Sequence, residues 1–327
     1  MKKIYLVTGA SGHLGTVLCK QLLNEGRTVR ALALPGEENH VPSGVRIITG
    51  DVTDPASLAA FFHHDEEKEI VVLHCAGIVT IASKTNPLVH KVNVEGTRNI
   101  LKLAQEYGAS KVVYICSVHG LVEAKEGDTK EASSYHPEQI DDQYGKSKAE
   151  AANIALDFYK QGLNVNIILP SGIFGPGDVR RNNHMIRAID AMAKGYIPVS
   201  LQGGFDFVDV RDVAAGIVAC AEKGKAGESY ILSGHYLTVK EILNEVNVVC
   251  NRRSSGIEIP YVLVKPFGTL AESIGNRLGK GKPLVTPYSL AILNTNGHFS
   301  HDKATKDLGY QTRPVRESIK DMIDELQ

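Results

Sequence analysis

The sequence predicts an α/β protein in which a doubly wound parallel sheet has helices on both faces and a smaller α+β lobe follows it. Three observations support this prediction. In the first half of the chain, short β-branched runs alternate with helix-like segments, which is typical of a parallel sheet covered on both sides. A glycine-rich turn joins the first run to the first helical segment. After residue 170 the alternation ends in a turn-rich passage, residues 171–178.

The predicted elements alternate along the first half of the chain, and right-handed crossovers should place the strands side by side in one sheet. The expected strands cover residues 4–7, 28–32, 45–49, 70–74, 111–116 and 165–169. The expected helices cover residues 15–24, 55–62, 89–107 and 144–161. Further along, residues 207–221 are expected to form a strand and then a helix, and residues 230–232 another buried strand.

A chain of 327 residues is long enough for one large domain and a smaller one. We expect residues 1–170 to form the sheet domain, with residues 205–233 folding back onto it. Residues 171–204 and 234–327 would then form a smaller lobe, which we expect to bind the substrate.

Composition excludes several classes of protein. The formal net charge of -1, without a basic tract, gives no electrostatic basis for binding nucleic acid or an anionic membrane. The five cysteines are widely spaced and form no C-x-x-C pair, which argues against a disulfide framework and a structural zinc site. No apolar stretch is long enough to span a bilayer, and the first apolar run is too short for a signal peptide. We therefore expect a cytoplasmic protein without a metal, nucleic-acid or membrane partner.

The first expected strand ends in the sequence Thr8-Gly-Ala-Ser-Gly-His-Leu-Gly15, which opens the first expected helix. Glycines in such a turn allow a tight bend, close approach of the backbone to a pyrophosphate, and packing of the helix on the strand. The helix N-terminus adds free N–H groups and partial positive charge. This context predicts a Rossmann dinucleotide-binding turn. Its expected cofactor contacts are Thr8, Gly9, Ser11, Gly12, His13, Leu14 and Gly15.

The choice between NAD and NADP stays open in the sequence. An acidic residue at the end of the second strand usually accepts hydrogen bonds from the adenosine ribose of NAD. Here Leu34 follows that strand, and Arg30 within it is interpreted as a solvent-facing side chain. Since no acid would repel a 2′-phosphate, the interpretation leans to NADP. Asp51 and Val52 follow the third strand, and Asp51 could hold the adenine amine.

Tyr144 and Lys148 are four residues apart, which places them on one face of a helix. A nearby ammonium lowers a phenol pKa from about 10, so Tyr144 could exchange a proton with an alcohol or a carbonyl. Lys148 would also donate hydrogen bonds to the nicotinamide ribose. Ser117 ends a strand at the carboxyl edge of the sheet, where ligands bind in such folds. These three residues are the predicted catalytic centre; an exposed, salt-bridged helix face is the alternative interpretation of the Tyr–Lys pair.

Further motifs extend this pattern. They are Asp51-Val52, His74-Cys-Ala-Gly77, Asn93-Val-Glu-Gly-Thr97, residues 169–177 and residues 207–214. With these motifs, the chain resembles an extended short-chain dehydrogenase/reductase, a superfamily that also contains nucleotide-sugar epimerases and dehydratases. The resemblance implies catalysis by Ser117, Tyr144 and Lys148. It also implies cofactor contacts from Asp51, Val52, Cys75, Ala76, Gly77, Pro170 and Ile173, and dimerisation through the helices 89–107 and 144–161.

The branch within this superfamily decides the reaction. Enzymes acting on nucleotide sugars typically place an arginine just before an Asp-Phe-Val-x-Val-x-Asp motif, and this chain has Phe205 there, although Arg180, Arg181 and Arg187 stay candidates for anion contacts. Residues 77–82, 261–264 and 266–267 are apolar, which favours ring-bearing or lipid-like substrates. Residues 286–310 resemble reductases similar to dihydroflavonol reductase and 3β-hydroxysteroid dehydrogenase.

The leading hypothesis is reversible hydride transfer between NAD(P)H and a ketone or secondary alcohol on an apolar molecule of the flavonoid, steroid or similar ring type. One alternative is a nucleotide-sugar epimerase or dehydratase with internally recycled NAD. The other is a cofactor-sensing protein without catalysis. His119, two residues after Ser117, is a candidate second proton donor.

Overall fold

The computed structural model describes residues 2–63, 68–80, 84–181, 183–253, 256–263 and 286–326. Its centre is a seven-stranded sheet with the strand order β10-β6-β5-β4-β1-β2-β3, in which all neighbouring strands are parallel. The predicted parallel sheet is therefore confirmed. Its strands are β1 (Lys2–Thr8), β2 (Thr28–Ala33), β3 (Arg46–Thr49), β4 (Lys68–His74), β5 (Lys111–Ile115), β6 (Val165–Pro170) and β10 (Ser229–Leu232).

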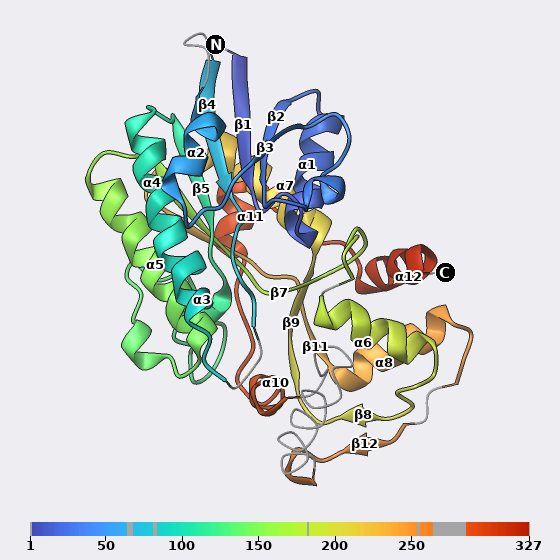
Figure 1. Ribbon diagram of the computed structural model, residues 1–327. Coiled ribbons are helices and arrows are strands. Elements are labelled where there is room, and N and C mark those ends of the chain that lie inside the picture. Colours follow the sequence, from blue (N-terminus) through green and yellow to red (C-terminus); the bar gives the residue numbers. More distant parts are fainter. Residues whose placement is uncertain are drawn as a thin grey trace.

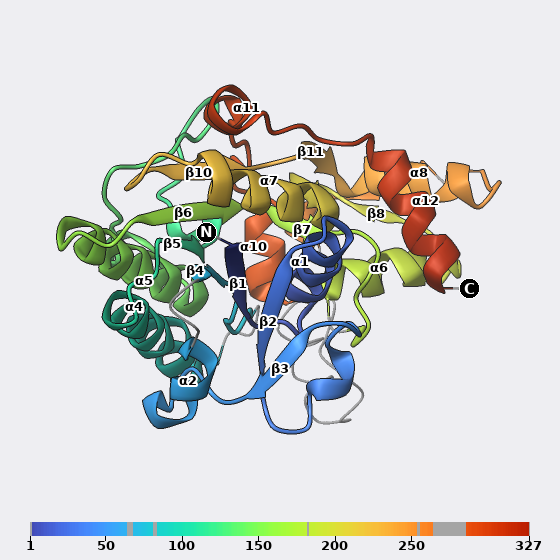
Figure 2. The same cartoon turned by 90° about the horizontal axis from the view of Figure 1, so that it is seen from above.

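Helices cover both faces of this sheet (Figure 1 and Figure 2). One face carries α2 (Pro55–Phe62), α4 (Thr97–Glu106) and α5 (Gln143–Lys160). The other face carries α1 (His13–Asn24), α7 (Val210–Lys223) and α11 (Asp302–Leu308). Helices α1 and α7 pack against each other, as do α4 and α5. The arrangement is doubly wound, as predicted.

The side chains of the central strands point alternately into two hydrophobic cores. In β1, Ile4 and Leu6 belong to the core under α2, α4 and α5. Tyr5 and Val7 belong to the core under α1 and α7. Because both faces of the sheet are buried, its strands are apolar throughout, which is why the sequence shows short continuous apolar runs there.

The strand order reverses between β1 and β4, because β2 and β3 extend the sheet in one direction and β5, β6 and β10 in the other. In open α/β sheets, ligands bind outside the carboxyl ends of the strands at such a reversal. The turn after β1 and the segment after β5 both begin at this edge. The topology therefore places the glycine-rich turn and Ser117 on the same side of the sheet.

A second group of elements lies beyond this carboxyl edge, in the lower part of Figure 1. It contains a three-stranded sheet in the order β11-β9-β7 and a two-stranded sheet of β12 and β8. Strand β9 pairs with β7 and β11, and α7 follows it directly onto the large sheet. The elements are β7 (Gly172–Phe174), α6 (His184–Ala193), β8 (Ser200–Leu201), β9 (Gly204–Asp209), β11 (His235–Thr238), α8 (Val239–Val249), β12 (Glu258–Ile259), α10 (Pro287–Ile292) and α12 (Val315–Leu326). The predicted boundaries of the two lobes stay a prediction.

The helix expected over residues 89–107 is interrupted. The structure has α3 (Pro87–His90), a π-helical segment at Lys91–Gly96 and then α4. In the π-helical segment, the carbonyl of Asn93 accepts a hydrogen bond from the Thr97 hydroxyl at 2.6 Å. The Asn93 side chain is held by Ile78 and Ser147. A side chain held by tertiary partners explains the local change of helix type, which periodicity alone does not predict.

Arg30 does not face solvent, contrary to the interpretation of the sequence. It is 4% exposed, and its guanidinium donates to the carbonyl oxygens of Phe61, at 2.8 Å, and His63. These carbonyls lie at the C-terminal end of α2, where backbone oxygens lack helical partners and where positive charge is favourable. Arg30 therefore joins β2 to α2.

Across the described ranges of the chain, no helix is both long enough and apolar enough to cross a bilayer. Parts of the apolar segments singled out in the sequence, namely Ile81, Ala82, Val264, Pro266 and Phe267, lie outside the described residues.

Candidate active site

The glycine-rich turn brings three backbone segments together. Gly9 has φ = 66°, and a Cβ there would lie 2.7 Å from the backbone nitrogen of Ala76. A Cβ on Gly15 would lie 2.1 Å from the carbonyl oxygen of Gly9. Gly12 is the N-cap of α1 and has no side chain that could accept hydrogen bonds from the first-turn N–H groups. This backbone cradle at a helix N-terminus fits a pyrophosphate.

Hydrogen bonds tie the turn to the end of β4. The Thr8 hydroxyl lies 2.7 Å from Nδ1 of His74 and accepts a hydrogen bond from the Ala76 N–H at 3.1 Å. Nε2 of His74 lies 3.0 Å from the Thr97 hydroxyl. Burial lowers the pKa of His74 to about 3, so its imidazole is neutral and connects β1 to the start of α4.

Apart from Tyr144 and Lys148, which are on α5, the sequence-predicted cofactor contacts lie at or just after the carboxyl ends of strands. The turn with Ser11, Gly12, His13 and Leu14 follows β1, and the other predicted contacts follow β3, β4 and β6. Those others are Asp51 and Val52, then Cys75, Ala76 and Gly77, then Pro170 and Ile173. Asp51 accepts a hydrogen bond from the Thr53 N–H at 2.8 Å, and Asp54 caps α2. The topology thus gathers these residues along one edge of the sheet.

Ser117 and Tyr144 come together at the same edge. Ser117 follows β5, and its hydroxyl accepts a hydrogen bond from the His119 N–H at 3.2 Å. Tyr144 is in the first turn of α5, which Asp142 caps by accepting from the Gly145 N–H. The Ser117 side chain is also near enough to the Tyr144 phenol to lower the pKa of that phenol, against the effect of burial. Ser117, Tyr144 and Lys148 are 6%, 7% and 4% exposed, so the exposed helix face considered for the Tyr–Lys pair does not exist.

Lys148 reaches from α5 to the loop after β4. Its ammonium donates to the carbonyl oxygen of Ile115 at 2.8 Å. A Cβ added to Gly77 would lie 3.2 Å from Nζ of Lys148 and 3.3 Å from Oδ1 of Asn93. Lys148, Asn93 and Gly77 therefore converge. The sequence motif contained Asn93 without giving it a role; the structure places Asn93 in the π-helical segment, beside Lys148.

The electrostatics of Tyr144 differ from the sequence expectation. A neighbouring ammonium was expected to lower the pKa of the phenol, but burial raises the pKa of Tyr144, and the neighbouring Ser117 side chain only opposes this rise. Burial lowers the pKa of Lys148. In this arrangement Tyr144 is a neutral phenol near pH 7, which suits a proton donor.

A cluster of aromatic side chains lies beside Tyr144. The His119 ring stacks on Phe205 with a centroid distance of 5.3 Å and an interplanar angle of 4°. The same His119 ring lies 6.0 Å from the Tyr144 ring and 6.3 Å from Tyr288. Phe205 also makes an edge contact with Phe299 at 5.6 Å. Burial lowers the pKa of His119, so this wall is uncharged near pH 7.

At the opposite end of the glycine-rich turn, a carboxylate contacts the turn. The Ser11 hydroxyl donates to Oε2 of Glu37 at 2.6 Å, and Arg180 pairs with Oε1 of Glu37 at 2.7 Å. Sequence reasoning missed Glu37 because it lies four residues beyond the end of β2. Its distance of 22 residues from Gly15 was the available signal, since an acid about 20 residues after such a turn is expected to contact ribose.

A hollow of about 580 Å³ lies at the amino edge of the large sheet and is lined partly by Ile4, Thr28, Arg46 and Tyr107. It is on the other edge of the sheet from Ser117 and does not belong to the candidate active site. In the part of the chain that the structure describes, no group of His, Cys, Asp or Glu side chains is arranged to hold a metal ion.

The glycine-rich turn and the group of Ser117, Tyr144 and Lys148 lie on one edge of a doubly wound sheet, which is the arrangement of an extended short-chain dehydrogenase/reductase. Residues 5–233 match the NAD dependent epimerase/dehydratase family, and the chain belongs to this family. The resemblance found in the sequence is therefore confirmed.

Relatives and solved structures cover nearly the whole chain. It is 27% identical over 321 residues to sterol demethylase protein B of Methylococcus capsulatus, covering 97% of this chain and 96% of that protein. It is 27% identical over 324 residues to a 3-beta-hydroxysteroid dehydrogenase of Mycolicibacterium neoaurum, covering 94% and 86%. The crystal structure of gox2253 matches with a TM-score of 0.83 and 28% identity over 99% of this chain and 98% of that chain.

Proposed function

We propose that this enzyme interconverts a ketone and a secondary alcohol on an apolar, ring-bearing small molecule, of the flavonoid or steroid kind, with NAD(P) as the cofactor. The observation that carries the proposal is the convergence of Ser117, Tyr144 and Lys148 at the sheet edge that also holds the glycine-rich turn. Burial of the three side chains would shield a bound carbonyl oxygen from water.

In the direction of reduction, the Ser117 hydroxyl and the Tyr144 phenol would hold the substrate oxygen, and Tyr144 would donate the proton to it. The raised pKa of Tyr144 supports this role, because the phenol keeps its proton until the substrate oxygen gains negative charge. Lys148 would orient the nicotinamide ribose, and Asn93 would help to position Lys148. The nicotinamide, when bound, supplies or accepts the hydride.

Two features support an apolar substrate. The wall of His119, Phe205 and Tyr288 is aromatic and uncharged, so flat apolar rings pack against it better than a diphosphate would. The relatives include proteins named for sterol and hydroxysteroid chemistry. At the position where sugar-nucleotide enzymes typically have an arginine, Phe205 is 3% exposed and stacked on His119.

Nicotinamide absorbance tests the proposal directly. The purified protein is incubated with each cofactor and a panel of steroid and flavonoid ketones, secondary alcohols and nucleotide sugars. We expect a net change in reduced nicotinamide with a ring-bearing ketone or alcohol. Conversion of a nucleotide sugar without a net cofactor change would instead identify an epimerase or dehydratase. Cofactor binding without turnover of any compound would favour a cofactor-sensing protein.

The Tyr144→Phe variant tests the assignment of the proton donor. Loss of a positioned general acid costs about 10²- to 10⁴-fold in turnover, and we expect a decrease in that range. Tyr159→Phe is the matched control, since Tyr159 is on the same helix but 41% exposed, and it should keep full activity. Full turnover by Tyr144→Phe would contradict the mechanism.

Two further expectations from the sequence stay predictions. They are dimerisation through α4 and α5 and a cytoplasmic location.

A further inference from the structure

A carboxylate, a hydroxyl and a guanidinium from three separate parts of the chain meet beside the glycine-rich turn. Oε2 of Glu37 accepts a hydrogen bond from the Ser11 hydroxyl at 2.6 Å. Oε1 of the same carboxylate pairs with Nη1 of Arg180 at 2.7 Å. Ser11 is 6% exposed, whereas the side chains of Glu37 and Arg180 are 22% and 35% exposed. The cluster is thus anchored on a buried hydroxyl and open to solvent on its outer side.

The position of the cluster identifies which part of a dinucleotide would reach it. Ser11 is inside the turn that fits the pyrophosphate, and Glu37 follows β2, the neighbour of β1 in the sheet. A dinucleotide whose pyrophosphate lies on the α1 N-terminus directs its adenosine ribose toward the end of the second strand. The hydroxyls of that ribose would therefore lie at Glu37.

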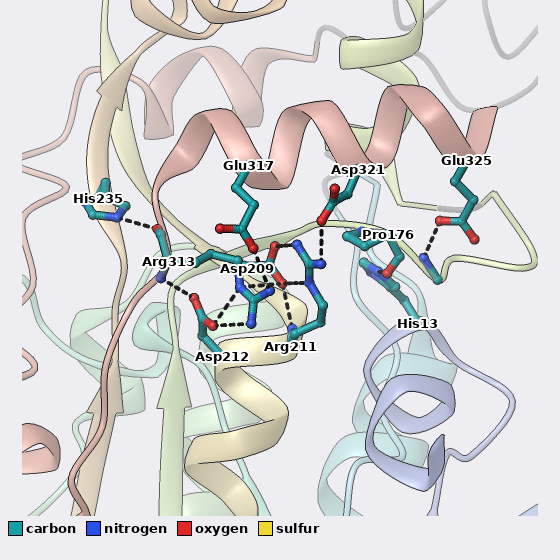
Figure 3. A network of polar contacts seen from close by, with 11 residues as sticks. His13, Pro176, Asp209, Arg211, Asp212, His235, Arg313, Glu317, Asp321 and Glu325 are labelled. Carbon is teal, nitrogen blue, oxygen red and sulfur yellow. Dashed lines mark hydrogen bonds and ion pairs between the residues drawn. The ribbon is translucent and has the colours of Figure 1, made fainter. Parts of the chain in front are cut away.

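The loop that carries Arg180 is held in place from two sides, as Figure 3 shows for its first residues. The Pro176 carbonyl oxygen lies 3.1 Å from Nε2 of His13 in the glycine-rich turn. The Gly177 N–H donates to Glu325 of α12 at 2.6 Å. Three residues later, Arg180 reaches Glu37. Because both anchors precede it closely, the guanidinium stays near the turn even if its partner changes.

We propose that Glu37 makes the enzyme selective for NAD(H) over NADP(H), and that Arg180 is a latent ligand for a 2′-phosphate which Glu37 occupies. The proposal rests on the proposed function only through the binding of a nicotinamide dinucleotide at the glycine-rich turn. It reverses the lean to NADP that the sequence suggested, which assumed that no acid lies near the ribose.

The physical reason is the competition for one guanidinium. With NAD, the Glu37 carboxylate accepts hydrogen bonds from the ribose hydroxyls and stays paired with the Arg180 guanidinium. A 2′-phosphate would place two anions beside each other, and this repulsion excludes NADP. If Glu37 loses its charge, Arg180 and the Ser11 hydroxyl become available, and both are suitable phosphate ligands.

Direct binding measurements test the proposal without a substrate. NADH and NADPH are titrated into the intact protein, and nicotinamide fluorescence gives the Kd of each. The wild type should bind NADH at least about tenfold more tightly than NADPH. Glu37→Gln should shift this ratio toward NADPH by about tenfold to a hundredfold. In Glu37→Gln/Arg180→Gln the gain for NADPH should disappear.

The matched controls make the same change of charge at neighbouring residues that do not belong to the Ser11–Glu37–Arg180 cluster. Glu38→Gln alters the neighbouring carboxylate and should leave the ratio of the two Kd values unchanged. Glu37→Gln/Arg181→Gln should keep the gain for NADPH, since Arg181 is exposed beside Arg180. Thermal melting of each variant checks that the fold is retained.

Three results would overturn the inference: equal affinity of the wild type for both cofactors, an unchanged ratio in Glu37→Gln, or a gain for NADPH that survives the loss of Arg180. Selective binding of NADH with no turnover of any ketone would leave the inference standing and contradict the proposed function. Binding of neither cofactor would overturn both.

Discussion

Asp206 is a buried carboxylate whose ionisation costs stability. It lies in β9, is 4% exposed, and accepts a hydrogen bond from the Gly234 N–H at 2.7 Å. Burial raises the pKa of Asp206 from 3.8 to about 6, although the positive fields of His235 and His298 oppose the rise. As pH increases, the unfolded chain therefore releases this proton before the folded protein does. The stability associated with Asp206 is present below about pH 4 and is lost as pH rises through about 6.

Asp206→Asn should remove this pH dependence, because the amide oxygen can still accept from Gly234 but does not ionise. Relative to the wild type, the variant should gain about 2 kcal/mol between pH 4 and pH 7, because each unit of pKa shift is worth about 1.4 kcal/mol and part of the change already lies below pH 4. Urea unfolding at both pH values measures the difference. Asp141→Asn, at an exposed position, serves as the control. A stability difference that is the same at both pH values would show that Asp206 ionises normally in the fold.

At the scale of elements, the β1–turn–α1 unit depends on the missing side chain of Gly15. A methyl group there would lie 2.1 Å from the Gly9 carbonyl oxygen and 2.8 Å from Cα of Ala10, and both are backbone atoms that cannot rotate away. Gly15→Ala should therefore separate α1 from β1, at a cost of about 1–3 kcal/mol, and weaken NADH binding. Gly12→Ala is the milder comparison, because its Cβ would approach only the Gly9 oxygen, at 3.2 Å. Equal unfolding free energies for the two variants would contradict this account.

At the scale of the whole molecule, ion pairs attach the C-terminal helix α12 to α7 (Figure 3). Arg211 at the start of α7 pairs with Asp209 at 2.8 Å and with Asp321 of α12 at 2.6 Å. Arg313, just before α12, pairs with Asp212 at 2.8 Å. The side chain of Asp209 is 1% exposed, so its charge depends on these partners. Residues more than 100 positions apart thereby fasten the end of the chain onto the nucleotide-binding half.

Arg211→Met should destabilise the protein by about 3 kcal/mol, because removing one partner of a buried ion pair leaves the other charge uncompensated. Arg316→Met is the control: Arg316 pairs with Glu245 at 2.7 Å but is 60% exposed, so solvent screens the pair and its loss should cost much less stability than the loss of Arg211. Hydrogen bonds from Arg211 hold the pKa of Asp209 below its ordinary value despite burial. The Arg211→Met effect should therefore shrink as pH falls below that ordinary value. Equal losses in both variants would show that burial does not strengthen the Arg211 network.

Much of the large sheet was predictable from local sequence. Its strands are buried on both faces, so their apolar runs stand out, and the helices 15–24, 55–62 and 144–161 agree with α1, α2 and α5 to within two residues. The interruption of the helix 89–107 was not predictable, because it depends on contacts of Asn93 with Ile78 and Ser147. The burial of Arg30 was missed for a similar reason, since its acceptors belong to the end of α2.

The sequence by itself determined the sheet, the glycine-rich turn and the spacing of Tyr144 and Lys148, since each depends on residues a few positions apart. Tertiary structure decided the burial, the packing partners and the charged neighbours of those groups. Burial keeps Tyr144 protonated, the stack of His119 on Phe205 forms an apolar wall, and Glu37 meets an arginine 143 residues away. The physical reason is that periodicity and turn chemistry act along the chain, whereas desolvation and charge pairing act through space between segments that only the fold brings together.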